Sequence, residues 1–346
     1  MRVLEVHSGN AVGGDSTRYT FVREQGESLE KQGCIVDYFA IVGKGLGGYL
    51  KNVSKLRSKI EEFRPDIVHA HYGLCGMVAV LATFGLSHLF LLKLARKTCR
   101  PKVVTTFHNG ETLNWKVNLL CSLFSMQADY VVYVAQHIYD KCIFKAKSYA
   151  IIPCGVTMED MVITPYEEAR KQLGWNQNNK KYILFGGSIS NQRKNYALLE
   201  AALNRIGKKS MDSNVWVISG NSFFEEIEVV EMRGFTREQC VLRMCACDCF
   251  CLPSLSEGSP QALKEAIALN CPAVATDMAD IRQLFGTEGG YYISDFTAES
   301  MTECLIKCLS FGERTSGRER ILELGLRNED VARKLKSIYD SILVYQ

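Results

Sequence analysis

Short apolar runs typical of strands alternate with helical patterns along almost the whole chain of 346 residues. Parallel strands need long crossover connections, usually helices, so this alternation predicts α/β layers built on parallel sheets. The strand candidates in the first half are residues 3–7, 35–42, 66–70, 103–107, 130–134 and 149–152. Those in the second half are residues 182–185, 215–219, 227–230, 249–252, 273–276 and 291–293.

Helical periodicity fills the intervals between these strands. The helix candidates in the first half lie near residues 16–32, 51–63, 76–97, 113–126 and 136–146. A last amphipathic helix is expected at about residues 328–345, where Val331, Leu335 and Ile338 follow helical spacing. The two series of strands therefore predict two doubly wound halves, joined by a polar stretch within residues 153–179.

Composition favours a soluble two-domain protein of the reducing cytoplasm. The apolar content of 47% with 23% charged residues is ordinary for globular proteins. The first residues read as a strand and not as a signal peptide, and fourteen cysteines are scattered without a disulfide-like framework. The alternating cysteines of residues 245–251 do not have the spacing of zinc ligands, so we expect them to be buried structural residues.

Charge is uneven between the two halves. Residues 1–150 hold 19 Lys and Arg against 12 Asp and Glu, a net charge of +7, and all six histidines. This excess predicts an anionic partner, such as a lipid diphosphate or a membrane surface, although a solvated excess of lysine explains it equally well.

A stretch without charges covers residues 67–92, and basic residues follow it at Lys93, Arg96, Lys97, Arg100 and Lys102. The pattern resembles a membrane span with a basic flank. Its glycines and histidines, and the strands on either side, favour a crossover helix buried against the sheet. The basic end then predicts peripheral contact with an anionic membrane on its cytoplasmic face.

The most informative motif is a pair of carboxylates, Glu257 and Glu265, eight positions apart around a loop-to-helix junction. Pro260 suits the first position of that helix. The free N–H groups and the positive dipole end of a helix N-terminus suit a phosphate. An anion there, with carboxylates reaching nearby hydroxyls, is typical of a nucleotide-sugar site, whereas the bare pair could equally be two solvated acids.

The fuller string Pro-Ser-x-x-Glu-Gly-x-Pro…Glu-Ala…Pro-x-Val-Ala-Thr-Asp, over residues 253–277, resembles the signature of the family 4 retaining glycosyltransferases. The resemblance implies the GT-B fold, with two doubly wound Rossmann-like domains facing a central cleft. It implies an N-terminal acceptor-side domain of residues 1–160, a nucleotide-sugar-binding domain of residues 161–327, and a final helix, about 328–346, that crosses back to the first domain.

The resemblance also implies roles for residues of the second half. Lys194 falls on the position of a family lysine that clamps the diphosphate, while Ser188 replaces the family arginine and leaves Arg193 as a candidate for the missing charge. Glu265 is expected to hold the ribose, and Glu257 the hydroxyls of the transferred sugar. The remaining donor-binding residues by this analogy are Gly258, Ser259, Gln261 and Ala262 at the helix start, and Gly234 and Phe235 near the base.

In the first half, His108 ends a strand and resembles the Phe-His-Gly loop with which the family contacts the donor sugar. Gly13 and Gly14 resemble the family's Gly-Gly loop near the diphosphate, although a plain turn explains them equally well. His69 and His71 resemble another family loop, and as a metal pair they lack an obvious third ligand. The chain has no Asp-x-Asp, so we expect no metal and no other cofactor.

The resulting prediction is a hexosyltransferase-type enzyme of polysaccharide or glycoconjugate biosynthesis, with Lys194, Glu257 and His108 as catalytic residues. It would move a sugar from a UDP- or GDP-sugar to a saccharide or lipid-linked acceptor, with retention and without a nucleic-acid partner. Same-face chemistry is favoured over a covalent intermediate on Glu257. The alternatives are an epimerase or phosphorylase on the same fold, or a catalytically silent binding subunit, which Ser188 would suit.

Overall fold

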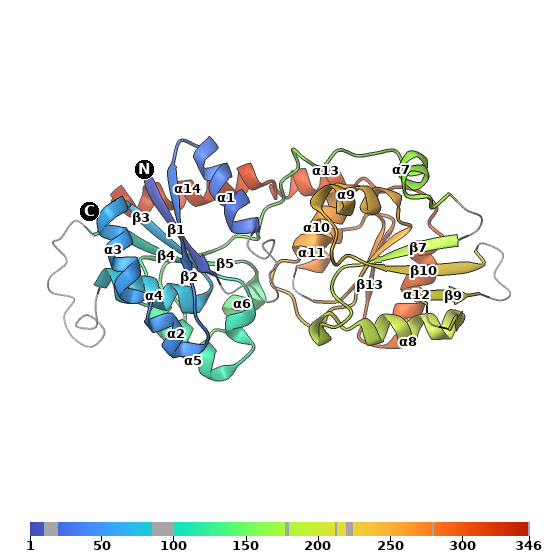
Figure 1. The fold of residues 1–346 in the computed structure, drawn as a ribbon, viewed down its shortest axis with the longest axis horizontal. Coiled ribbons are helices and arrows are strands. Elements are labelled where there is room, and N and C mark those ends of the chain that lie inside the picture. Colours follow the sequence, from blue (N-terminus) through green and yellow to red (C-terminus); the bar gives the residue numbers. More distant parts are fainter. Residues whose placement is uncertain are drawn as a thin grey trace. The chain divides into compact units, whose positions relative to one another are not determined.

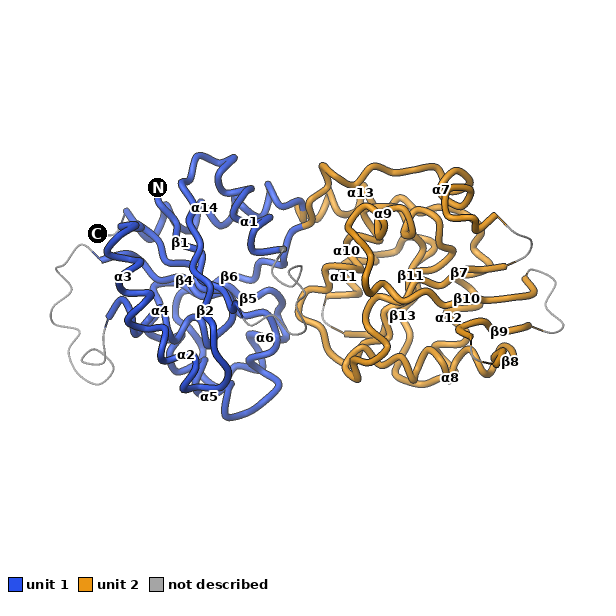
Figure 2. The backbone as a smooth tube through the Cα atoms, viewed as in Figure 1, with its two compact units in different colours: residues 1–155, 327–346 blue, residues 156–326 orange. Residues whose placement is uncertain are grey.

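The computed structural model describes residues 1–9, 20–84, 100–176, 180–211, 213–218, 224–278 and 280–344 (Figure 1). The chain divides into two compact units (Figure 2). Unit 1 comprises Met1–Gly155 and Arg327–Gln346, and unit 2 comprises Val156–Leu326. Each unit has its own sheet with helices packed against it, as the alternation in the sequence predicts.

Unit 1 contains a six-stranded sheet in the order β2-β1-β3-β4-β5-β6, and all neighbouring strands run parallel. The strands are β1 Arg2–Ser8, β2 Ile35–Ile41, β3 Ile67–His71, β4 Lys102–Phe107, β5 Tyr130–Tyr133 and β6 Tyr149–Ile151. Each lies within two residues of its predicted position. Because the strands are parallel, the loops that follow them leave from one edge of the sheet.

The helices of unit 1 are α1 Thr20–Lys31, α2 Gly45–Leu50, α3 Val53–Phe63, α4 Gly73–Phe84, α5 Trp115–Ser125, α6 Gln136–Lys141 and α14 Asn328–Val344, with a short 3-10 turn, η3, at Gly110–Thr112. The sequence did not predict α2, whose Gly-rich stretch has low helix propensity. Helix α14 belongs to unit 1 and lies beside α1. Its Leu335 and Tyr339 are buried in one core with Val3 of the sheet.

The described part of the charge-free run, residues 67–84, forms β3 and then α4, a buried crossover helix. A Cβ on Gly76 would lie 2.5 Å from the side chain of Thr105, so the helix packs directly on β4. None of the helices in the described parts of the chain is long and apolar enough to span a membrane. Lys93, Arg96 and Lys97 lie outside the described residues, and Arg100 and Lys102 both pair with Asp129.

Unit 2 contains a seven-stranded sheet in the order β13-β12-β11-β7-β10-β9-β8. The strands are β7 Lys180–Phe185, β8 Lys208–Lys209, β9 Val215–Val217, β10 Glu226–Glu231, β11 Cys249–Leu252, β12 Ala273–Thr276 and β13 Tyr291–Ser294. The strands from β13 to β10 are parallel, whereas β9 and β8 add an antiparallel edge. The sequence did not predict β8, because two lysines carry no apolar pattern.

The helices of unit 2 cover both faces of its sheet. They are α7 Tyr166–Leu173, α8 Tyr196–Ile206, α9 Arg237–Ala246, α10 Gln261–Ala268, α11 Ile281–Phe285, α12 Ala298–Leu309 and α13 Gly317–Glu323, with a 3-10 turn, η4, at Gln192–Lys194. Leu184 and Phe250 face one core, and Phe185 and Cys251 face the other, as the alternation of a strand requires. The buried structural position predicted for the cysteines of β11 is confirmed.

Candidate functional site

The candidate donor site of unit 2 lies where its parallel strands end. The loop after β11 holds Glu257, and η4, which follows β7, holds Lys194. The backbone N–H of Leu255 donates to the carbonyl of Arg193 at 2.8 Å, which ties the two segments together. Ligands of open α/β sheets bind beyond the carboxyl ends of the strands, and these two side chains lie there.

Lys194 and Glu257 form a partly buried ion pair. Nζ of Lys194 lies 2.7 Å from Oε1 of Glu257, and the side chains are 19% and 10% exposed. Gly187, just after β7, makes room for the lysine, since a Cβ there would lie 2.6 Å from Cγ of Lys194. The pair therefore depends on the glycine as well as on its two charged members.

Helix α10 begins at Gln261, and Pro260 is its N-cap residue. The sequence predicts Pro260 at the first helical position, so the helix begins one residue later than expected. Glu257 precedes the helix start and Glu265 lies in the second turn, so the two carboxylates bracket the helix N-terminus in the structure. Lys264, which is fully buried, donates to Oγ of Ser259 at 2.8 Å. This bond holds the loop against the helix that follows it.

Sequence reasoning missed Arg237, the first residue of α9. Its guanidinium lies 3.5 Å from Oε1 of Glu265 and donates to the carbonyl of Thr157 at 3.2 Å. Its place directly after the loop of Gly234 and Phe235 is the signal that could have found it. Gly234 has a φ of +83°, which favours glycine. The guanidinium of Arg243 lies 3.6 Å from the ring centre of Phe235.

The loop before η4 carries the departure from the family pattern. Ser188 lies 2.9 Å from Ser190, hydroxyl to hydroxyl, and Arg193 is exposed. Lys194 is thus the cation that this loop places against Glu257. A role of Arg193 in place of the family arginine stays a prediction.

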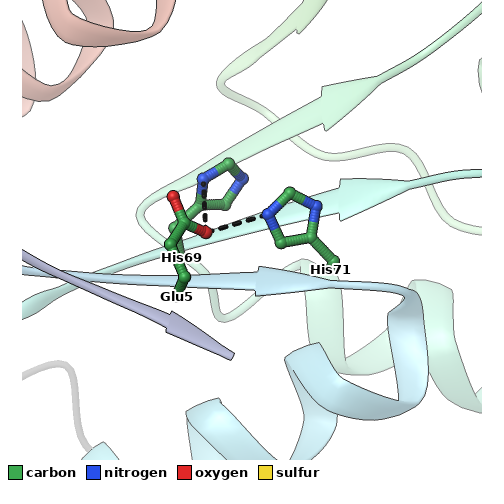
Figure 3. Close-up of side chains that lie close together, drawn as sticks. All are labelled: Glu5, His69 and His71. Carbon is green, nitrogen blue, oxygen red and sulfur yellow. Dashed lines mark hydrogen bonds and ion pairs between the residues drawn. The ribbon is translucent and has the colours of Figure 1, made fainter. Parts of the chain in front are cut away.

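Unit 1 holds a buried polar cluster at its sheet, formed by Glu5 of β1 and by His69 and His71 of β3 (Figure 3). Oε2 of Glu5 lies 2.8 Å from Nε2 of His71 and 3.5 Å from Nδ1 of His69. His69 also bonds to Thr106 and Tyr339, each at 2.7 Å. The sequence missed Glu5 as their partner, because the strand-to-strand register that brings it to His69 is not written in either strand alone.

Electrostatics within the cluster favour an ionised carboxylate and a neutral His71. Burial raises the pKa of Glu5, but the attraction of His69 and the hydrogen bonds from His69 and His71 outweigh it and hold the pKa at about 2. Burial and the neighbouring His69 lower the pKa of His71, against the opposing pull of Glu5. A neutral imidazole carries one N–H and one lone pair, so its partners decide which nitrogen holds the proton.

His108 follows β4 in a loop of unusual backbone. Its Nε2 lies 3.2 Å from Nδ1 of His71. Asn109 has a φ of +122°, a strained value for a residue with a side chain. Glu111 is buried and accepts from the backbone N–H groups of Gly73, His108 and Asn109, and burial raises its pKa in spite of those bonds. The hydrogen bonds of the buried Glu111 carboxylate thus hold the loop that carries His108.

A pocket of about 230 Å³ opens beside this loop in unit 1. It is lined by Ser8, Tyr49, Tyr72, Leu74, Gly110, Glu111 and Val117. The hydroxyl of Tyr49 donates to Oγ of Ser8 at 3.2 Å. Two aromatic rings and a carboxyl beside open space are groups that suit a sugar ring.

Gly13 and Gly14 lie outside the described residues. As to metal ions, the described residues bring the ligand atoms of Glu5, His69 and His71 within 4.8 Å of one another. Nε2 of His71 already bonds to the carboxylate, and Nδ1 of His69 bonds to Tyr339. Hydrogen bonds within the protein therefore account for the arrangement.

Comparison with known families covers both units. Residues 180–310 match the model described as Glycosyl transferases group 1, and residues 19–160 match the model described as Glycosyltransferase Family 4. The chain belongs to the family 4, or group 1, glycosyltransferases. This glycosyltransferase is 37% identical over 62 residues to a protein of Bacillus subtilis (strain 168) named as a teichuronic acid biosynthesis glycosyltransferase, TuaC. That match covers 18% of this chain and only 16% of TuaC.

Solved structures show that the glycosyltransferase has the GT-B fold. Sucrose-phosphate synthase from Thermosynechococcus elongatus matches over 100% of both chains, with a TM-score of 0.75 and 15% identity. Alr3699/HepE of Anabaena, in complex with UDP-glucose, matches over 99% of this chain and 100% of its own, with a TM-score of 0.73 and 14% identity. The catalytic domain of starch synthase IV from Arabidopsis thaliana, bound to ADP and acarbose, matches over 99% of both chains, with a TM-score of 0.72 and 12% identity.

Proposed function

We propose that this glycosyltransferase moves a sugar from a nucleoside diphosphate sugar to a saccharide or lipid-linked acceptor, with retention of anomeric configuration. One observation carries the proposal: the Lys194–Glu257 pair lies at the start of α10, with Glu265 in the second turn of the same helix. The cation and the helix N-terminus can bind the diphosphate of such a donor, and the two carboxylates can accept hydrogen bonds from its hydroxyls.

The donor would rearrange the contacts of this site without needing new groups. A diphosphate offers Lys194 a stronger partner than one carboxylate, so Nζ turns to the phosphate and frees Glu257 to accept from sugar hydroxyls. Glu265 lies in the second turn of α10, 3.5 Å from Arg237, and its carboxylate would accept from two vicinal ribose hydroxyls. Gly234 and Phe235 remain the candidate contacts of the base.

Same-face displacement fits these roles better than a covalent intermediate. As the bond from the anomeric carbon to the phosphate oxygen breaks, negative charge develops on the leaving diphosphate, where Lys194 and the helix end stabilise it. The leaving phosphate oxygen then accepts the proton of the acceptor hydroxyl, which attacks the same face. Glu257, bonded to a lysine, serves as a hydrogen-bond acceptor and not as the nucleophile. The reaction as proposed needs no metal ion.

We place the acceptor in the pocket beside the His108 loop. The rings of Tyr49 and Tyr72 offer flat apolar faces to a sugar ring, while Ser8 and Glu111 offer hydrogen bonds to its hydroxyls.

The comparisons support a nucleotide-sugar donor and a role in polysaccharide synthesis, but they identify neither the base of the donor nor the polysaccharide. One GT-B neighbour holds UDP-glucose and another holds ADP, so they favour a nucleotide sugar but not one base. The likeness to TuaC, over its short matched segment, favours a role in a surface polysaccharide such as those of cell envelopes. Uracil is the base that we would test first.

Peripheral binding to an anionic membrane is the second part of the proposal, and α5 carries it. Trp115, Leu119 and Leu123, spaced four residues apart on one helix face, are 65%, 38% and 43% exposed. The loop after α6 borders this face, because the N–H of Ile143 bonds to Asn118 at 3.2 Å, and it adds exposed lysines such as Lys145. An apolar helix face beside basic residues is typical of interfacial binding.

A donor panel with product analysis tests the function. The protein is incubated with UDP-, GDP- and ADP-sugars and simple glycoside acceptors, and nucleotide release is followed together with the NMR coupling constant of the new anomeric proton. We expect one donor to give acceptor-dependent release and a product of unchanged anomeric configuration. An inverted product would refute same-face chemistry. Isomerised donor without acceptor would instead favour an epimerase, and transfer to free phosphate a phosphorylase.

A further inference from the structure

A line of hydrogen bonds runs from the core of unit 1 towards its surface. It starts at the carboxylate of Glu5, continues through both ring nitrogens of His71 at 2.8 and 3.2 Å, and ends on the ring of His108. Glu5 and His71 are fully buried, whereas His108 is partly exposed. Beyond it, Nδ1 of His108 lies 3.8 Å from the thiol sulfur of Cys154.

We propose that Glu5 and His71 are positioning residues that hold His108 in one tautomer, with the proton on Nε2 and the lone pair on Nδ1. The inference concerns the protein without its ligands. It rests on the proposed function only where the partner of Nδ1 is named as a hydroxyl of a sugar substrate.

The order of protons along the line follows from the chemistry of its first member. An ionised carboxylate can only accept, so Nε2 of His71 must donate to Glu5. His71 is neutral, which leaves a lone pair on its Nδ1. That lone pair can only accept, so Nε2 of His108 must donate to it. A neutral His108 then has its own lone pair on Nδ1.

Ring contacts hold His108 in the orientation that the line requires. The ring centre of Phe21, from α1, lies 5.0 Å from that of His108, and the ring centre of Tyr72 lies 4.7 Å from it. Below, the bonds of Glu111 to the backbone N–H groups of His108 and Asn109 fix the loop. The imidazole is therefore restricted on several sides as well as tied at Nε2.

The arrangement gives Nδ1 a defined chemical capacity. A thiol is a weak donor at 3.8 Å, so a substrate hydroxyl can take its place and donate to Nδ1. If the ring takes up a proton, its Nε2–H bond to His71 and the carboxylate beyond stabilise the added charge. The line thus resembles in logic the buried acid that orients a catalytic histidine in hydrolases, although here two histidines are linked.

Other titratable groups face the line and share its electrostatics. His69 lies beside Glu5, and Tyr339 reaches the same cluster from α14. His7, on β1, opposes a positive charge on His71. Glu111 lies under the loop of His108. Among the residues that the structure describes, His71 is the side chain that bonds to both Glu5 and His108.

Tautomers can be read directly by long-range proton–nitrogen NMR on protein labelled with ¹⁵N-histidine. At neutral pH we expect His71 and His108 both to carry the proton on Nε2. His71→Gln keeps an amide for Glu5 but lacks an atom in the place of Nδ1, so His108 should become a mixture of tautomers. In Glu5→Gln the new amide can donate as well as accept, so His71 and His108 should each become a mixture of tautomers. Without the negative charge, the pKa of His108 should also be lower than in wild type.

Tyr339→Phe is the matched control, because it removes a hydroxyl from the same buried cluster without cutting the line. Its His108 should keep the wild-type tautomer and protonation. Variants that fold are identified by a far-ultraviolet circular dichroism spectrum close to that of wild type. If His71→Gln does not fold, the NMR spectrum of the wild-type histidines tests the proposal by itself. A wild-type His108 protonated on Nδ1, or a His108 unaffected by His71→Gln, would overturn it. So would a stoichiometric metal ion on the purified protein, since it would occupy the nitrogens that must carry protons. None of these readouts depends on transfer activity, so the proposed function can fail separately.

Discussion

Lys194→Met should damage stability and turnover by separable amounts. The substitution keeps the length of the side chain and removes its charge, which leaves Glu257 without its partner at 2.7 Å. Gly187 stays unchanged beside it, so the methionine side chain can lie in the space that the lysine side chain occupied. Methionine is flexible enough to occupy that space without displacing its neighbours.

The expected magnitude follows from the burial of the pair. Removing one partner of a buried ion pair costs about 3–5 kcal/mol, and an exposed pair contributes about 0.2–1 kcal/mol. With side chains 19% and 10% exposed, the loss should be about 2 kcal/mol, in the range of a hydrogen bond to a charged group. For turnover, loss of one preorganised group that stabilises developing charge costs about 10²–10³ in kcat.

The assay pairs urea unfolding with initial rates of sugar transfer, at a temperature where every variant is folded. The double variant Lys194→Met/Glu257→Gln removes both charges and should recover most of the lost stability but not the turnover. Lys209→Met is the control for loss of a lysine from an exposed pair, since Lys209 and Glu200 are about a third exposed, and it should change neither by much. Near-normal turnover in Lys194→Met, or turnover that returns together with stability in the double variant, would refute the role of Lys194 at the leaving group.

Three further predictions concern single features. Gly187→Ala places a Cβ 2.6 Å from Lys194, so it should lower turnover with little effect on the circular dichroism spectrum; an unchanged rate would contradict the close fit. Because the pKa of Glu5 is lowered to about 2 from an ordinary 4.5, its contribution to stability is present above pH 4.5 and is lost as the pH falls towards 2. The wild-type free energy of unfolding should therefore fall more steeply over that range than that of Glu5→Gln, as urea titrations at several pH values would measure; parallel curves would argue against it. Trp115→Ser/Leu119→Ser should reduce sedimentation with vesicles containing phosphatidylglycerol while leaving transfer to a soluble acceptor unchanged, and equal sedimentation would remove α5 from membrane binding.

Local sequence was sufficient to predict the features that depend on one segment. The strands of both sheets, apart from β8, follow from apolar runs, and α4 follows from an uncharged stretch between two strands. The position of Glu257 and Glu265 around a helix start also follows locally, because turn and helix signals lie in the same segment. Pro260 was misplaced by one residue, which is a usual error at helix ends.

Contacts between distant segments could not be predicted in the same way. Arg237 meets Glu265, and Glu5 meets His71 across 66 positions, only after strand order and register are known. The sequence suggests His71 only as part of a pair with His69, whereas its partners Glu5 and His108 lie on β1 and in the loop after β4. A search for polar residues on adjacent parallel strands would have brought Glu5 into view, whereas the strained φ of Asn109 has no local sequence signal.

Calorimetric titration with a nucleotide sugar, on wild type and Glu265→Gln, tests most directly whether the carboxyl edge of the unit 2 sheet holds the donor. Glutamine keeps the shape of the side chain but weakens acceptance from two ribose hydroxyls. We expect wild type to bind one of UDP-, GDP- or ADP-glucose, and Glu265→Gln to bind the same compound at least about tenfold more weakly, a change of about 1.4 kcal/mol. Equal affinity of the two proteins would contradict the assignment of the donor to this edge.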